Sequence, residues 1–147
     1  MKTLWNESSR RELTDRLVRL TPEAKPLWGK MNAPQMLAHL DSMMRMTKGE
    51  LKTVSKNVPL RHAPLKQIVV YWMPWPKGVP TAPELLGNEV SDWAAGIADI
   101  CQHIKYFATR DRNLPWPEHP AFGRMTSRAW GVLGYRHIDH HLRQFGI

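Results

Sequence analysis

The sequence has little that would allow disulfide bonds or a membrane span. Its 147 residues include one cysteine, Cys101, so no disulfide can form within the chain. A chain of this kind fits a reducing compartment, and the cytoplasm is the expected location. No apolar run approaches the roughly 20 residues that cross a bilayer, and "MKTLWNESSRRE" at the N-terminus lacks the apolar stretch of a secretory signal. No membrane partner is therefore expected.

Several motifs of common functions are also missing. The chain has no glycine-rich loop that could cradle a phosphate, no recognisable pair of catalytic carboxylates, and no defensible Ser-His-Asp order. The formal net charge is +8, but no run of five basic residues occurs. Nucleic-acid binding would rest on charge alone and is not expected. No acid–base catalytic residue can be named from the sequence.

Apolar residues recur at helical spacing in four segments, at about 9–20, 32–49, 88–109 and 126–146. Capping boxes are expected at Ser9 with Glu12 and at Asn32 with Gln35. The stretch "PLRHAPLKQIVVYW" is expected to form a short helix, although its β-branched residues also suit a strand. The following "MPWPKGVPTAPELLG" is rich in proline and is expected to be irregular. The sequence thus predicts one all-α domain over residues 1–147, a four-helix bundle with an extra short helix.

Histidines are concentrated near the C-terminus, in "HIDHHLRQFGI". His137 and His141 are one turn apart on the face of the last helix that also carries Leu133 and Gly134, and two imidazoles at this spacing can converge on one ion. Gly134 would leave room beside them. His39, on the apolar side of the second helix, is the candidate third ligand. Three imidazoles would leave part of the coordination sphere open, as in catalytic rather than closed structural sites. Zinc, nickel or iron would fit, and the sequence does not distinguish among them.

The simpler interpretation stays open at this point, because histidines at such spacing often only form hydrogen bonds or face solvent. His140 and Gln144 are expected to support or orient a ligand rather than bind the ion. Cys101 is expected to be an inert core thiol. The pocket-wall candidates are Trp72, Trp75 and Trp116, and the histidines treated as structural or surface residues are His62, His103 and His119.

The motif "HIDHHLRQ" resembles the His-x-x-His-His-x-x-Gln signature of the DinB/YfiT-like four-helix bundle superfamily. "MNAPQMLAHL", "KGVPTAPEL" and "HPAFGRMTSRAW" are similar to segments of a bacterial branch known as a domain of unknown function, so the resemblance covers about residues 28–147. It implies a DinB-like fold and a divalent metal held by His39, His137 and His141. It also implies that metal-dependent transferase chemistry with a small-molecule thiol is a candidate activity.

Two main functions therefore stand beside each other. The first is a metal-dependent enzyme of the thiol transferase type, or a hydrolase, acting on a thiol or another small ligand. The second is a non-catalytic, metal-stabilised bundle that acts as a dimeric binding module. The homodimer is expected because Val132, Tyr135 and Leu142 form a second apolar stripe on the last helix. A helix that is apolar on two sides is either central to its fold or packed against another subunit.

Overall fold

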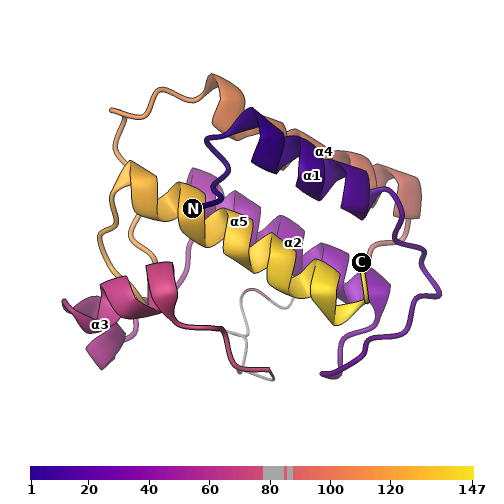
Figure 1. Ribbon diagram of the computed structural model, residues 1–147, viewed down its shortest axis with the longest axis horizontal. Helices are drawn as coiled ribbons and strands as arrows, with labels where there is room; N and C mark the ends of the chain where they lie inside the picture. Colours follow the sequence, from indigo (N-terminus) through magenta and orange to yellow (C-terminus); the bar gives the residue numbers. More distant parts are fainter. Residues whose placement is uncertain (78–84, 86–87) are drawn as a thin grey trace.

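The computed structural model describes residues 1–77, 85 and 88–147, and within these residues the regular structure is helical. Four long helices form a small bundle: α1 (Glu7–Leu17), α2 (Ala33–Lys48), α4 (Trp93–Thr109) and α5 (Ser127–Gln144). α2 packs mainly on α4, and α1 lies against α4 and α5 (Figure 1). The predicted all-α bundle is confirmed. None of the helices described is both long and apolar enough to cross a bilayer.

A short helical segment joins α2 to the proline-rich connection, which confirms the predicted short helix. It consists of η1 (Pro59–Arg61), α3 (Leu65–Gln67) and the π-helical η2 (Ile68–Trp72). Arg136 of α5 donates hydrogen bonds to the carbonyl groups of Val69, Val70 and Met73. These bonds satisfy carbonyls at a helix end and attach the segment to α5. Much of the proline-rich connection, residues 78–84 and 86–87, lies outside the described residues.

The helix starts agree with the sequence patterns in two cases. At α2, the Asn32 side chain accepts from the Gln35 backbone while Gln35 accepts from the Asn32 backbone, which is the predicted capping box. At α5, Thr126 accepts from the backbone of Ala129. Each side chain satisfies an N–H group that the first helical turn leaves free.

The other two helix starts differ from the prediction. The expected capping box at Ser9 and Glu12 is wrong, because α1 already begins at Glu7 and buries Ser9 inside the helix. Glu12 instead bonds Lys2 and the hydroxyl of Tyr135. α4 begins at Trp93 rather than near residue 88, since the Asp92 side chain caps it by accepting from the backbone of Ala95.

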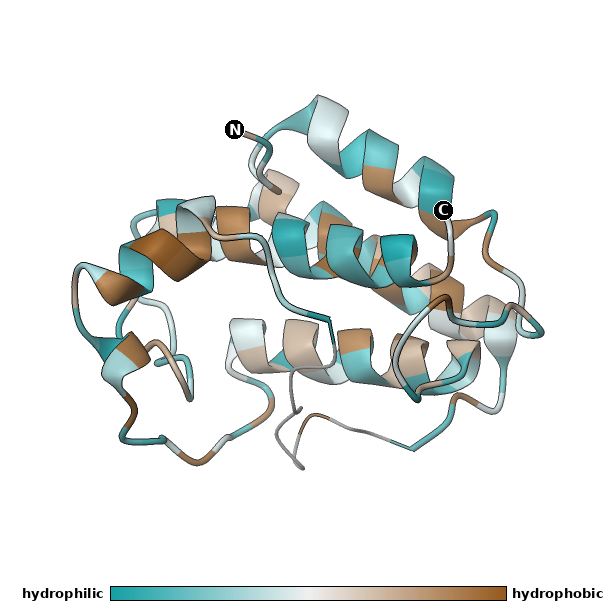
Figure 2. Cartoon of the chain, turned by 60° about the horizontal axis from the view of Figure 1, so that its bottom comes forward, coloured by the Kyte–Doolittle hydropathy of each residue, from teal (hydrophilic) through white to brown (hydrophobic). Residues whose placement is uncertain are grey.

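α5 is central to the fold, which decides between the two interpretations of its second apolar stripe. Val132, Tyr135 and Leu142 are 2%, 5% and 0% exposed within the single chain. The helix packs against α1, α2 and the short η2 segment. Each long helix carries both hydrophobic and hydrophilic residues (Figure 2). The stripe therefore gives no surface argument for a homodimer.

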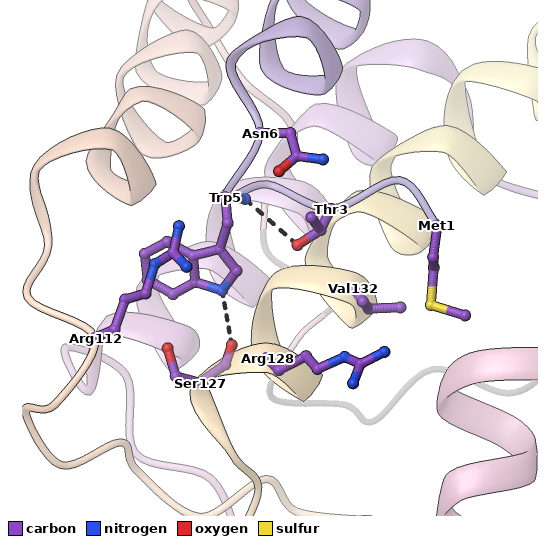
Figure 3. A pocket seen from close by; sticks show the side chains of 8 residues that line it. All are labelled: Met1, Thr3, Trp5, Asn6, Arg112, Ser127, Arg128 and Val132. Atoms are coloured by element: carbon purple, nitrogen blue, oxygen red, sulfur yellow. Dashed lines mark hydrogen bonds between the residues drawn. The ribbon is translucent and has the colours of Figure 1, made fainter.

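The N-terminal segment packs against α5 at two positions where the helix has glycine. Trp5 donates its indole N–H to the carbonyl of Ser127 at 2.8 Å (Figure 3), and a Cβ on Gly131 would come within 2.3 Å of the Trp5 ring. At Gly134 a Cβ would lie 2.6 Å from Leu4, so Leu4 fills the space that was expected to stay open beside the histidines. That expectation is wrong because the glycine accommodates the N-terminal segment instead.

Candidate metal centre

The structure brings the three candidate ligands to one point between α2 and α5. The Nε2 atom of His137 lies 3.1 Å from the Nε2 atom of His39 and 3.1 Å from that of His141. One ligand nitrogen from each ring lies within 4.8 Å of the others. Among the described residues, this is the one group of three or more His, Cys, Asp or Glu side chains with such convergence. Nitrogens this close can share one ion at bonds of about 2 Å.

Hydrogen bonds on the far side of two rings fix their orientation. The Nδ1 atom of His39 lies 2.7 Å from the carbonyl oxygen of Leu85, and that of His141 lies 2.9 Å from Oε1 of Gln144. A carbonyl oxygen can only accept, so Nδ1 carries the proton in both rings and Nε2 keeps its lone pair. Metal-binding histidines in proteins are usually supported in this way.

The orientation of Gln144 is itself determined by a second bond. Its Nε2 donates to the carbonyl of Trp28 at 2.7 Å. Because that carbonyl cannot donate, the amide must direct Oε1 toward His141. Gly29 lies beside this contact with φ +82°, and a Cβ there would come within 2.5 Å of Gln144 Nε2. The Trp28–Gly29 turn thus supports His141 through Gln144.

The three imidazoles are neutral near pH 7. Burial lowers the pKa of His39, and burial together with the neighbouring rings lowers the pKa of His137 well below its usual value. The same two causes lower the pKa of His141 to about 3. The Nε2 atom of His137 faces the Nε2 lone pairs of both His39 and His141. It can donate at most one proton, so it cannot form a hydrogen bond to each of them. Neutral nitrogens held in such mutual contact form a donor set that suits a cation.

An aromatic rim lies beside the histidines. The Trp75 ring is 5.5 Å from His137 and 6.0 Å from His140, and the Trp28 ring is 5.9 Å from His140, measured between ring centroids. Lys77 lies 4.4 Å above the Trp28 ring. His140 is half-buried next to His141, and burial lowers its pKa. Trp75 and His140 therefore lie directly beside the histidine cluster.

The two other tryptophans that were pocket candidates lie elsewhere. Trp72 is 75% exposed at the end of η2. Trp116 stacks on Phe107 and Trp130, in an aromatic group that also includes Trp5. A cavity of about 400 Å³ opens next to Trp5, and its lining contains none of the three ligand histidines (Figure 3).

The remaining histidines and the cysteine have ordinary roles. His62 is exposed. His103 bonds Asp41 at 2.8 Å and so links α4 to α2. His119 accepts from two backbone N–H groups, and burial lowers its pKa to about 4. Burial raises the pKa of Cys101, which agrees with a poorly reactive thiol.

The carbonyls of Leu85 and Trp28 are the parts of the site that the sequence did not indicate. Every residue has a backbone carbonyl, so no residue type marks the one that will meet a histidine. The flanking "WG" at residues 28–29 is the single local signal, because glycine allows the positive φ of this turn.

The fold and the cluster together define a small helical bundle with a buried group of three converging imidazoles. The family described as "Protein of unknown function (DUF1569)" matches residues 7–146, and the chain belongs to this family. No curated protein and no solved structure matches the chain significantly.

Proposed function

We propose that His39, His137 and His141 bind one divalent metal ion through their Nε2 atoms. The observation that carries this proposal is the pair of 3.1 Å separations from His137 to the other two rings. The outer hydrogen bonds support it, since they leave Nε2 of His39 and His141 free to coordinate. Zinc, nickel and iron all accept such ligands.

The proposed activity is that of a metal-dependent enzyme of the thiol transferase type, as the DinB-like resemblance implies. A divalent ion bound by three imidazoles lowers the pKa of a thiol or water that occupies an open position. In this chain, Gln144 would keep His141 in its metal-binding tautomer. Trp75 and His140 would contact the ligand at the rim and limit the access of water.

A non-catalytic, metal-stabilised bundle is the alternative, and it explains the same three histidines. It is favoured by the make-up of the group, since within the described residues no carboxylate joins the three histidines. The apolar stripe of Val132, Tyr135 and Leu142, from which a dimer was expected, is buried within the single chain and so does not support a dimeric form.

The test is to load purified, untagged protein with cobalt and to titrate it with a low-molecular-weight thiol. We expect one cobalt per chain and a thiolate-to-cobalt absorption band when thiol is added. His137→Ala should lose the metal, whereas the exposed His62→Ala should keep it. Binding of one metal without any thiol band or thiol-dependent turnover would favour the non-catalytic alternative. Equal cobalt binding by the His137 variant would contradict the site itself.

A further inference from the structure

The short helical segment carries an exposed apolar face in addition to the face that packs on α5. Val69 and Val70 are buried. On the other side, Leu65, Ile68 and Trp72 are 40%, 44% and 75% exposed, at the spacing of one helix face. A helical segment that is apolar on both sides is typical of one that packs against a second partner.

Exposed apolar residues gather in this part of the chain. Nine large apolar side chains are exposed in the described residues, and five of them fall between residues 51 and 77. They are Val54, Leu65, Ile68, Trp72 and Met73. The segment lies outside the body of the four long helices, at the end where α5 begins (Figure 1). It therefore projects from the bundle of the four long helices.

The same segment is basic. Residues 51–77 contain five lysines or arginines and no aspartate or glutamate. Two arginines from outside the segment lie next to it. Arg124, which precedes α5, accepts a hydrogen bond from Lys66 through its backbone carbonyl at 2.9 Å, and Arg128 of α5 lies 5.7 Å from the Tyr71 ring. Glu118 pairs with Arg61 and Arg124 and is the one acidic side chain bonded to this group in the described residues. The segment and the residues that contact it therefore carry a net positive charge.

We infer that the segment 51–77 is a peripheral docking surface for an anionic lipid membrane. Apolar side chains with a tryptophan and surrounding basic residues are typical of segments that lie in the interface of a bilayer. Basic side chains near an anionic leaflet each contribute to binding, and tryptophan prefers the headgroup level. Such binding does not require a helix that crosses the bilayer.

A second copy of the chain is a weaker partner on grounds of charge. In a two-fold dimer the same patch would face itself, so the basic side chains of one copy would oppose those of the other. An acidic protein would also compensate the charge, but the exposed Trp72, on a segment that projects from the four long helices, favours a lipid interface (Figure 1). An anionic lipid surface accepts both the apolar side chains and the positive charge.

The experiment is sedimentation of the untagged, full-length protein with vesicles of phosphatidylcholine alone or mixed with phosphatidylglycerol. We expect binding to the anionic vesicles, weakened by salt, and little binding to the neutral ones. Trp72→Ser should weaken binding by about tenfold and Arg124→Gln by about fivefold. Arg124 suits this purpose because its side chain is 93% exposed.

Matched control variants separate the patch from the overall composition. Val18→Ser removes an apolar side chain that is 59% exposed at the end of α1, and Arg11→Gln removes an exposed charge from the same helix. Both controls should bind vesicles as the unmodified protein does. Absence of vesicle binding, or equal losses in patch and control variants, would overturn the inference. A dimer in sedimentation equilibrium that Trp72→Ser dissociates would identify a second copy as the partner instead.

Discussion

Replacing Gln144 by methionine tests whether the hydrogen bond to His141 supports metal binding. The side chain is 3% exposed and makes two bonds, one to Nδ1 of His141 at 2.9 Å and one to the Trp28 carbonyl at 2.7 Å. Methionine fills a similar space but leaves both partners unsatisfied. Each stranded polar group costs about 1–3 kcal/mol, so the metal-free protein should lose about 2–6 kcal/mol of unfolding free energy.

In the Gln144→Met variant, the affinity of the folded protein for the metal should also fall. Loss of the partner that orients a ligand typically weakens metal binding by about 10–100-fold, which corresponds to about 1.4–2.7 kcal/mol. The assay is competition with a chromophoric chelator at fixed pH, alongside urea unfolding of the metal-free form.

Gln144→Glu is the matched comparison. Its carboxylate still accepts from His141 but cannot donate to the carbonyl of Trp28. We expect a similar loss of stability with metal affinity within about threefold of the unmodified protein, since the supporting acceptor is kept. If the folded methionine variant bound metal as tightly as the unmodified protein, the proposed supporting role of Gln144 would be refuted.

Three further predictions follow from the packing. Gly131→Ala should lower the unfolding free energy by about 1–3 kcal/mol in urea titrations, because its Cβ would overlap the Trp5 ring. Gly96→Ala, where the nearest atom would be 3.3 Å away, should change it by less than about 1 kcal/mol, and equal losses in the two variants would contradict the packing argument. Burial lowers the pKa of His119 from 6.5 to about 4, so the folded state disfavours its protonation. The contribution of His119 to the unfolding free energy is therefore complete above pH 6.5 and falls, by at most about 3 kcal/mol, as the pH decreases toward 4. His119→Asn keeps an acceptor for the two backbone N–H groups and should reduce the pH dependence of the unfolding free energy without abolishing it, because the lowered pKa values of His39, His137 and His141 act in the same direction. Unfolding at several pH values measures this, and an unchanged slope would exclude His119 as a source. Arg136→Met should speed hydrogen exchange in residues 65–73, because it removes the bonds to three carbonyls of that segment, and unchanged exchange there would show that they are not needed.

The pairing of His137 and His141 was predictable from the sequence because it depends on helix geometry, whereas their convergence with His39 was implied by the family resemblance. The spacing of His137 and His141 places them on one face of any α-helix. His39 was a candidate because it lies on the apolar side of the second helix, and the resemblance to the DinB-like motif implied that it is the third ligand; the structure brings its ring to the other two. The support of the cluster was less accessible. The carbonyls of Leu85 and Trp28 reach the site through tertiary structure, and a backbone group leaves no mark in the sequence.

Two errors of the sequence analysis have a common physical origin in contacts made by the N-terminal segment. Ser9 and Glu12 have the spacing of a capping box, but Asn6 starts the helix earlier and Glu12 pairs with Lys2. Gly134 has no side chain, but Leu4 occupies the space above it. In both places the N-terminal segment provides the deciding contact, and its position on α5 follows from long-range packing.

X-ray absorption of the protein loaded with zinc or nickel tests the central claim most directly. The arrangement of His39, His137 and His141 predicts one ion per chain, with three imidazole nitrogens among its nearest neighbours at about 2 Å. A variant with His39→Ala should lose this signal. An ion surrounded by oxygen alone, or the absence of any ion at one per chain, would contradict the account.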